Sequence, residues 1–332
     1  MKPILRLTLA LSVMTPLLAV APAAAEDPPA LGCGSVVTTD VTLTADITGC
    51  PGDGLIVGKN GITIDLGIHR LAGGEGYSDV AVPGSVGVRI GKYDGVTVKG
   101  APTDPLALSN NEIVGFETAV LLGSGAEKNT VRGLNLRGVR FGVALRKAHR
   151  NTIDANSVSF AGGRMPEPCA AGPDAEAGIL LIDSDRNTVR SNTAQLGLFG
   201  ILLQRSDNNT IAANQAAPTW SDGNQCDGIL LSASSGNRIV DNITANAVPH
   251  GIRIGGGSPD NIVKRNIAFQ NGGDGILVLN RKTTLGANKA TRNQGWGINA
   301  VRGVTASGNG AAENFGPGQC RNIACKPVAP PG

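Results

Sequence analysis

One short phrase recurs along the chain from Asn129 onward. It contains an Asn, often a small polar residue, a β-branched residue or Leu and, a few positions later, a second Asn. Successive copies begin 22, 36, 22, 28, 24 and 22 residues apart. A unit of this length cannot bury its own apolar face and must stack on its neighbours, so the repeat predicts a solenoid. The copies begin at Asn129, Asn151, Asn187, Asn209, Asn237, Asn261 and Thr283.

Each unit carries a second signal, a Gly followed by a short apolar run, as in Gly178-Ile-Leu-Leu, Gly200-Ile-Leu-Leu and Gly251-Ile-Arg-Ile. Short runs rich in β-branched residues and bounded by Gly or Asn are typical of strands. No window shows a sustained helical period, and the framework of a leucine-rich repeat is missing. The sequence therefore predicts an all-β chain folded as a parallel β-helix.

The recurring Asn residues have a structural interpretation. Asn tolerates the left-handed turn conformation, and its amide can hydrogen-bond the equivalent Asn one coil above and below. We therefore expect the Asn positions to lie in left-handed turns and to form ladders.

The first 25 residues resemble a secretory signal. Lys2 and Arg6 precede an apolar stretch over Leu7–Val20, and three alanines end at Ala25. We expect cleavage there and a secreted or periplasmic location. Loss of the two cations lowers the formal charge from +3 to +1, which is not the basic surface of a nucleic-acid binder. No second apolar stretch is long enough to span a membrane, and we expect a monomer.

Six Cys residues in an exported chain indicate disulfides. Cys33 and Cys50 bracket the first predicted strands, and Cys320 and Cys325 form a close pair near the C-terminus. The remaining pair is then Cys169 with Cys226.

The expected organisation is a signal peptide over 1–25, an N-terminal segment and cap over 26–53, a β-helix over 54–315 and a C-terminal tail over 316–332. Two insertions interrupt the repeats, Ala161 to Ala177 and Ala217 to Gln225. Both fall in the same half of the coil and so emerge on one side, where insertions commonly build a binding face. Arg164 and Trp220 lie in them as candidate ligand contacts.

The residue before each Gly-apolar run forms one predicted column. In a register of about 4.8 Å per coil, Asp227, His250 and Asp274 become neighbours, with Phe199 and Trp296 above and below as candidate substrate contacts. Arg253 lies on the strand beside His250. These residue types are typical of a sugar-processing site. The alternative interpretation is structural: Asp-Gly is a common turn pair, His250 then caps a turn, and the aromatic residues pack at a corner.

The phrase NTI-x-x-N with a later G-I-x-L resembles the right-handed parallel β-helix, or pectin-lyase-like, superfamily. It is similar to a family of secreted and periplasmic β-helix repeat proteins that includes mannuronan epimerases and the β-helix protein of copper-site maturation. Asp227-Gly-Ile and His250-Gly-Ile match two fragments of the polygalacturonase pattern, while its paired Asp and its Arg-Ile-Lys are absent. Val248-Pro249-His250 matches the Asp-Pro-His signature of the epimerases only in part.

The expected ligand is an extracellular polysaccharide, and three functions are considered. The lyase or epimerase class is favoured, because the Arg and the His lie together. In a lyase or epimerase, His250 would remove the proton next to a uronate carboxylate, Arg253 would neutralise that carboxylate, and an Asp would hold the His tautomer or a Ca²⁺ ion. In an inverting hydrolase, Asp227 and Asp274 would act as acid and base at roughly 9.6 Å. A non-catalytic scaffold would bind a glycan or a protein partner.

Overall fold

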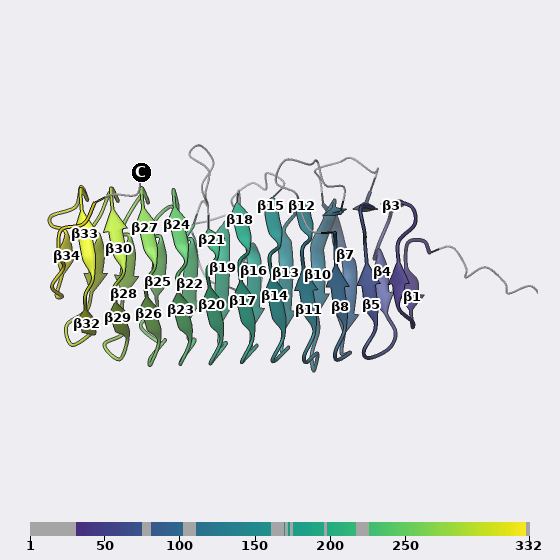
Figure 1. Ribbon diagram of the computed structural model, residues 1–332, viewed down its shortest axis with the longest axis horizontal. Coiled ribbons are helices and arrows are strands. Elements are labelled where there is room, and N and C mark those ends of the chain that lie inside the picture. Colours follow the sequence, from purple (N-terminus) through teal and green to yellow (C-terminus); the bar gives the residue numbers. More distant parts are fainter. Residues whose placement is uncertain are drawn as a thin grey trace, which may run out of the picture. The chain divides into compact units, whose positions relative to one another are not determined.

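The protein, seen here as a computed structural model, is a right-handed parallel β-helix. The structure describes residues 31–74, 81–101, 111–160, 169, 172, 175–195, 198–216 and 226–329. Three parallel sheets run along the column of coils, and each coil contributes one strand to each sheet (Figure 1). The fold predicted from the repeat is therefore confirmed.

The strands follow one another in a fixed rotation through the three sheets. The first, sheet A, has 12 strands, and sheets B and C have 11 each. Sheet A contains β1 (Ser35–Val37), β4 (Leu55–Val57), β7 (Val82–Gly91), β10 (Phe116–Leu122), β13 (Phe141–Arg146), β16 (Ala177–Ile182), β19 (Phe199–Gln204), β22 (Ile229–Ser232), β25 (Ile252–Ile254), β28 (Ile276–Val278), β31 (Ile298–Ala300) and β34 (Cys320–Arg321). Sheet B contains β2 (Val41–Thr42), β5 (Thr63–Asp65), β8 (Thr97–Lys99), β11 (Thr130–Arg132), β14 (Thr152–Asp154), β17 (Thr188–Arg190), β20 (Thr210–Ala212), β23 (Arg238–Val240), β26 (Ile262–Lys264), β29 (Thr284–Gly286) and β32 (Thr305–Ser307). Sheet C contains β3 (Ile47–Cys50), β6 (Leu71–Gly73), β9 (Glu112–Val114), β12 (Asn135–Val139), β15 (Ser157–Phe160), β18 (Thr193–Gln195), β21 (Gln215–Ala216), β24 (Ile243–Ala245), β27 (Ile267–Phe269), β30 (Lys289–Thr291) and β33 (Gly310–Ala312).

The repeat register is set by the Asn residues. The N–H of Asn151 donates to Oδ1 of Asn187 on the next coil at 2.8 Å, and its side-chain amide donates to the same oxygen at 3.2 Å. The second Asn of the phrase forms a parallel ladder, in which Asn192 donates in the same two ways to Asn214. These side chains are buried, so the ladders satisfy backbone groups that the corners would otherwise leave unpaired.

The left-handed conformation falls one residue earlier than we expected. Many of the residues with positive φ directly precede a ladder Asn, such as Arg150 at 57° and Ser191 at 55°. Asn151 and Asn192 themselves are not among them. The prediction that the ladder Asn occupies the left-handed turn is wrong, because the preceding residue makes the corner and thereby turns the Asn side chain inward.

Apolar side chains fill the interior in stacked rows. One row runs through Val143, Ile179, Ile201 and Ile229, which pair in register along sheet A and are fully buried. A second buried cluster lies on the outer face of the same sheet and includes Leu180 and Leu202. Sheet A is thus covered on both faces over its middle coils.

The ends of the column differ from the expected boundaries. Residues 35–50, which we expected to form a cap, supply β1, β2 and β3 and are the first coil itself. At the other end, β34 extends sheet A, and Lys326 forms a bridge with Gly310 in the last coil. The structure contains the three expected disulfides, Cys33–Cys50, Cys169–Cys226 and Cys320–Cys325.

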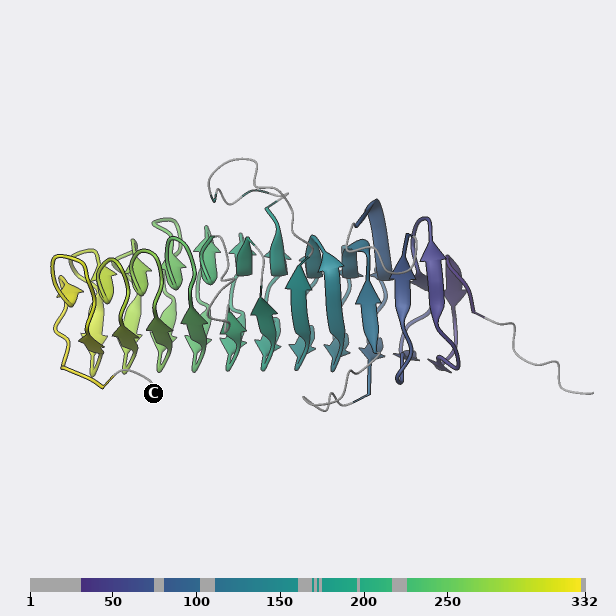
Figure 2. The ribbon, with the colours of Figure 1, turned by 90° about the horizontal axis from the view of Figure 1, so that it is seen from above.

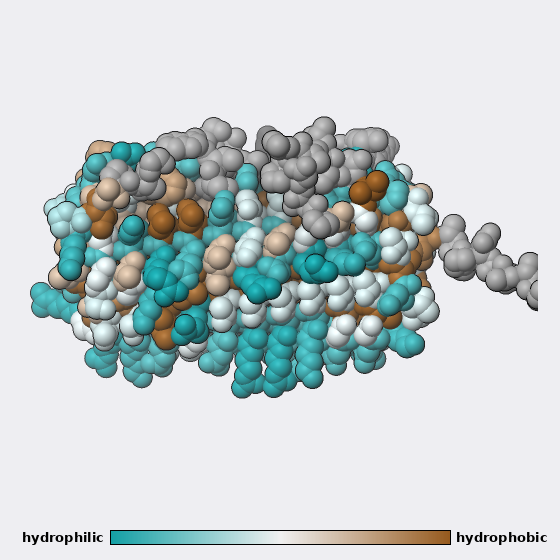
Figure 3. Space-filling model, viewed as in Figure 1, coloured by the Kyte–Doolittle hydropathy of each residue, from teal (hydrophilic) through white to brown (hydrophobic). Residues whose placement is uncertain are grey.

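Figure 2 shows the strands repeating at even spacing along the length of the column. The face displayed in Figure 3 is mixed, with a hydrophilic row along its lower edge and apolar residues scattered above. Within the described ranges, no helix has the length and apolar character needed to cross a membrane.

Candidate functional site

The predicted column of Asp227, His250 and Asp274 exists. The N–H of Gly228 donates to the carbonyl of His250 at 3.0 Å, and the N–H of Gly251 donates to that of Asp274 at 3.1 Å. The three residues therefore lie on successive coils at the start of β22, β25 and β28. The register of the fold, rather than any local motif, brings them together.

Each side chain in the column accepts a backbone N–H from the next coil. Asp227 Oδ1 accepts the N–H of His250 at 3.2 Å, and His250 Nδ1 accepts that of Asp274 at 3.0 Å. Asp274 Oδ1 accepts the N–H of Trp296 at 2.7 Å, and its Oδ2 accepts the amide of Asn299 at 2.9 Å. The column is therefore a hydrogen-bonded ladder comparable to the Asn ladders.

The hydrogen bond to His250 fixes its tautomer. Because Nδ1 accepts an N–H, the neutral ring carries its proton on Nε2. Burial lowers the pKa of His250, against the opposing effect of Asp274, whose Oδ2 lies 3.9 Å from Nδ1. The ring is therefore neutral, and the lone pair of Nδ1 already accepts the N–H of Asp274. This state does not favour the predicted role of His250 as the base that removes a proton.

A second histidine elsewhere in the column of coils makes the same contact. His149 Nδ1 accepts the N–H of Asp185 at 3.0 Å, and the carboxylate of Asp185 lies 3.8 Å away. His149 was not a candidate site residue. The geometry around His250 is thus also found where no site was predicted, which supports the capping interpretation.

Asp227 and Arg253 form a buried ion pair. Arg253 Nε lies 2.7 Å from Asp227 Oδ2, and the Asp side chain is 0 % exposed. The N–H does not point along the contact, so this is an ion pair without an aligned hydrogen bond. Burial raises the pKa of Asp227 to about 6, although Arg253 and the N–H of His250 act to lower it. Arg253 occupies the position that Leu230 and Leu277 hold on the neighbouring coils, and it supplies the counter-charge to this carboxylate.

The aromatic candidates are packed to different degrees. Phe199 is 1 % exposed and belongs to the outer cluster of sheet A, so its burial does not fit the predicted substrate contact. Trp296 is half-buried, and Gly318 lies directly against its ring. Trp220 and Arg164 lie outside the described residues.

The described part of the first insertion covers sheet A. Cys169 and Ala175 pack on the outer cluster, and the amide of Gln204 donates to the carbonyl of Gly172 at 2.9 Å. The disulfide from Cys169 to Cys226 holds this segment to the column. We expected the insertion to border an open binding face; its described residues instead close the face over the middle coils.

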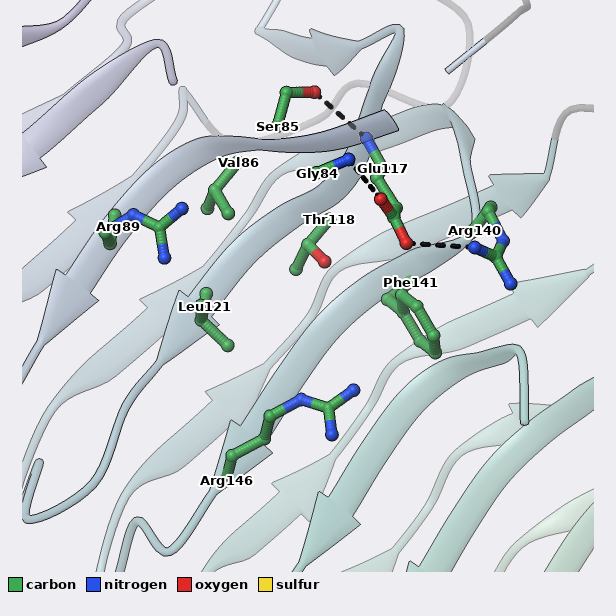
Figure 4. Close-up of a pocket in the computed structure, with 10 residues that line it drawn as sticks. All are labelled: Gly84, Ser85, Val86, Arg89, Glu117, Thr118, Leu121, Arg140, Phe141 and Arg146. Carbon is green, nitrogen blue, oxygen red and sulfur yellow. Dashed lines mark hydrogen bonds and ion pairs between the residues drawn. The ribbon is translucent and has the colours of Figure 1, made fainter. Parts of the chain in front are cut away.

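Sequence reasoning missed an open cavity of about 460 Å³ on the outer face of sheet A, at β7, β10 and β13. Figure 4 shows three guanidinium groups around it, those of Arg89, Arg140 and Arg146, with Glu117 and Phe141 between them. A signal for it was present, because Gly87-Val-Arg-Ile repeats the pattern of Gly251-Ile-Arg-Ile and places an Arg on the same outward row.

Carboxylates hold two of these arginines in place. Asp53 accepts from Arg89 Nε at 2.5 Å and from Nη2 at 2.9 Å. Arg140 donates to Glu117 at 2.9 Å and to Glu176 at 2.7 Å. The pKa of Arg89 is raised by its hydrogen bonds to Asp53. These two guanidinium groups, of Arg89 and Arg140, are therefore charged and held in place before any ligand arrives.

The Phe141 ring lies between the guanidinium groups of Arg140 and Arg146. The guanidinium carbons of Arg140 and Arg146 lie 5.6 and 5.8 Å from the centre of the Phe141 ring, within cation–π range. Glu117 also accepts the N–H of Gly84, and its own N–H donates to Ser85 Oγ at 3.3 Å. The cavity is thus lined by polar groups whose positions are set by the surrounding coils.

The chain matches the protein family described as "Periplasmic copper-binding protein (NosD)", over residues 78–253 and 219–314. These ranges cover most of the chain. The chain belongs to the NosD family. A comparison with curated protein sequences found no match.

Solved structures share the fold of this NosD-family chain. The alginate lyase from Paenibacillus sp. is 15 % identical, with 79 % of this chain and 89 % of the lyase covered and a TM-score of 0.52. The Dettilon tailspike protein is 16 % identical, with coverage of 86 % and 60 % and a TM-score of 0.49. The A-module of a mannuronan C-5 epimerase from Azotobacter vinelandii is 11 % identical, with coverage of 89 % and 91 % and a TM-score of 0.49. At these identities the likeness concerns the fold alone.

The family description names copper, but the described residues do not fit a copper site. Copper is bound by His, Cys thiolate and Met side chains. All six Cys are in disulfides, and His69, His149 and His250 lie on separate coils. No group of three His, Cys, Asp or Glu side chains in the described ranges converges on one point, which applies equally to the Ca²⁺ considered for Asp227 or Asp274.

Proposed function

We propose that this NosD-family chain is a periplasmic, non-catalytic protein that binds an acidic polysaccharide on the outer face of sheet A. The observation that carries this proposal is the open cavity at β7, β10 and β13, with its three guanidinium groups. The family description supports the periplasmic location. Three disulfides are consistent with an oxidising compartment.

The chemistry of the cavity suits a carboxylate flanked by hydroxyl groups. A guanidinium has five N–H donors, and Asp53 takes two of those of Arg89. The others are available to a ligand carboxylate, which Arg recognises through two parallel hydrogen bonds. Because the side chain is already held, little rotamer entropy is lost on binding.

The site lies on a surface shaped to follow a chain-like ligand. Coils repeat about every 4.8 Å along the column, so successive sugar units can meet equivalent positions on successive strands. The cavity spans β7, β10 and β13, and the covered middle coils border it on one side. An oligosaccharide of a few residues is therefore the expected ligand.

Binding is tested by calorimetric titration of the full chain with alginate oligomers and with neutral maltooligosaccharides. We expect binding of the alginate oligomers, and Arg89→Gln with Arg146→Gln to weaken it roughly tenfold or more. Arg190→Gln is the matched control, because Arg190 is an exposed arginine paired with Asp154 on sheet B. Equal affinity for both sugars, or an equal loss in the control, would reject the proposal.

An enzyme site at Asp227, His250, Asp274 and Arg253 is the second candidate. It is favoured by the pKa of about 6 for Asp227, since a carboxyl that titrates near neutrality can exchange a proton. A lyase would release an unsaturated product that absorbs ultraviolet light, an epimerase would change the uronate stereochemistry without it, and an inverting hydrolase would release reducing ends. Turnover that is lost in His250→Ala and kept in His149→Ala would establish this candidate in place of the binding function.

A further inference from the structure

A second cavity lies at the corner that follows sheet A in the last coils. It has a volume of about 660 Å³ and is formed by the turns after β25, β28 and β31. Arg281, Lys282 and Arg302 line it together with Leu279, and all four side chains are exposed. Three positive charges therefore share one concave surface.

These cations lack the carboxylates found at the same corner of earlier coils. There, Arg150 pairs with Glu127 at 2.8 Å and Arg205 pairs with Asp183 at 2.7 Å. None of the ion pairs in the described ranges includes a cation of the second cavity. Asp260, in the turn after β25, is exposed and makes no ion pair with any of these three cations among the residues that the structure describes. The positive charge is therefore left for a ligand.

Hydrogen bonds of Asn280 hold the turn that carries Arg281 and Lys282. The amide of Asn280 donates to the carbonyl of Gly256 at 2.5 Å, and its Oδ1 accepts the N–H of Lys282 at 3.0 Å. Gly256 and Gly257 leave the wall as bare backbone, although a Cβ at Gly257 would meet nothing closer than Ala233 Cα at 3.8 Å. Packing therefore does not require glycine at Gly257.

We propose that this second cavity binds a phosphate-bearing ligand. A phosphomonoester or pyrophosphate concentrates two or more negative charges in a small volume, whereas a uronate spreads one charge over each sugar. Three cations around a single cavity match the denser charge, and Arg side chains bind phosphate oxygens in pairs. The exposed Leu279 provides an apolar surface beside the phosphate.

This site is independent of the polysaccharide proposal. Six steps in the strand order of sheet A separate β10 from β28, which corresponds to roughly 29 Å along the column. In the first cavity, by contrast, Arg89 and Arg140 are ion-paired with Asp53, Glu117 and Glu176. Ligands of the two cavities should therefore bind without competing.

The test is a titration of the full chain with inorganic pyrophosphate at low ionic strength. A variant with Arg281→Gln, Lys282→Gln and Arg302→Gln should lose roughly tenfold in affinity for each cation removed. The matched control replaces Lys128, Lys147 and Arg186 with Gln, which removes three exposed cations from the same corner of earlier coils. The control should bind as the unchanged protein does, and alginate binding should be unaltered in both variants.

The source of the phosphate is distinguished with vesicles. Co-sedimentation with phosphatidylglycerol vesicles but not with phosphatidylcholine vesicles, competed by pyrophosphate, would assign the site to lipid headgroups. Pyrophosphate binding without vesicle binding would assign it to a soluble phosphate compound. Absence of both, or an equal loss in the control variant, would overturn the proposal.

Discussion

The same Asp–Arg pair occurs twice on sheet A, once on its early coils and once beside its covered middle coils. Asp53 and Asp227 each precede a Gly-apolar run, and each carboxylate accepts a backbone N–H of the next coil, at 3.0 and 3.2 Å. Arg89 and Arg253 lie on the strand of that next coil, with Nε 2.5 and 2.7 Å from the carboxylate. The sequence patterns and the backbone contacts of the two pairs are alike.

Their surroundings are not alike. The side chains of Asp53 and Arg89 are 19 % and 35 % exposed and border an open cavity. Asp227 has no exposed surface, and it follows Cys226, whose disulfide holds the first insertion over sheet A. Where the outer face of sheet A is open, the Asp–Arg pair thus provides fixed hydrogen-bond donors for a ligand. Beside the first insertion, which we call the cover, the same pair contains a buried, titratable carboxyl. The presence of the cover, rather than the sequence pattern, therefore distinguishes the two pairs.

The largest effect should come from removing the cover. Cys169→Ser with Cys226→Ser opens a loop with a sequence separation of 57 residues, which we expect to cost about 4 kcal/mol in the free energy of unfolding. The outer cluster should then bind a hydrophobic dye, and the pKa of Asp227 should decrease toward that of an exposed carboxyl. Urea denaturation and NMR titration measure the two changes.

The Cys320–Cys325 pair is the matched control for this experiment. Its sequence separation is only 5, so its loss should cost about 2 kcal/mol without altering the pKa of Asp227. An Asp227 pKa that stays raised after the cover is released would show that the coils themselves bury the carboxyl.

The next largest effect is a difference in stability between variants of Arg253 and Arg89. Arg253→Leu leaves Asp227 buried without its counter-ion and should lower the unfolding free energy by about 3 kcal/mol at pH 8. Arg89→Leu removes the partner of a partly exposed carboxylate and should cost less than about 1 kcal/mol. Chemical denaturation of both variants measures the difference, and equal losses would contradict the contrast between the pairs.

A double variant tests whether the uncompensated charge of Asp227 causes the loss of stability in Arg253→Leu. Arg253→Leu with Asp227→Asn removes the uncompensated carboxylate and retains an oxygen that can accept the N–H of His250. Because Leu230 and Leu277 flank this position, the new Leu packs among apolar neighbours. We expect the double variant to recover most of the lost stability.

The fold and the neighbours within the column were predictable because both follow from a fixed repeat. A register of one coil brings Asp227, His250 and Asp274 together without any knowledge of side-chain contacts. The spacing of the repeats does not determine the group toward which a side-chain lone pair points. The contact of His250 Nδ1 with the N–H of Asp274 depends on the backbone geometry of the corner. Because of this contact, the ring no longer suits the role of a base.

The second feature that could not be predicted from the sequence is which part of the outer face of sheet A the first insertion covers. The position of the first insertion indicated a binding face, but its described residues pack against Leu180 and Leu202 and close it. The open cavity formed instead where Arg89 and Arg140 meet charged partners from other coils. The Gly-Val-Arg-Ile pattern marks the position of Arg89, but the ion pair of Arg140 with Glu117, 23 positions away, has no such signature.

A smaller effect is expected in the pH dependence of stability. The folded-state pKa of Asp227 is about 6, above the value near 3.9 of an unfolded Asp. Between pH 4 and 6 the folded chain therefore holds more protons than the unfolded chain, and the contribution of Asp227 to stability decreases as the pH rises, by about 2 kcal/mol. Denaturation of the unchanged protein and of Asp227→Asn at several pH values should show this slope only in the former.

Asp183 provides a control of opposite sign. Its hydrogen bond to Arg205 lowers its pKa, so its contribution to stability is present above the unfolded pKa and is lost as the pH falls through the folded pKa. Asp183→Asn should therefore remove a contribution that increases with pH. The same slope in both variants would count against the raised pKa of Asp227.

The smallest effect concerns the two histidines. If His250 serves as a cap, His250→Ala and His149→Ala should each lower the unfolding free energy by about 1 kcal/mol, because each leaves one backbone N–H, that of Asp274 or Asp185, without its acceptor. Hydrogen exchange at these two amides locates the change, and both should exchange faster in the respective variant. A much larger loss at His250 would mean that its ring also supports the Asp227–Arg253 pair, and the two Asp–Arg pairs would then differ in their ladder as well as in their cover.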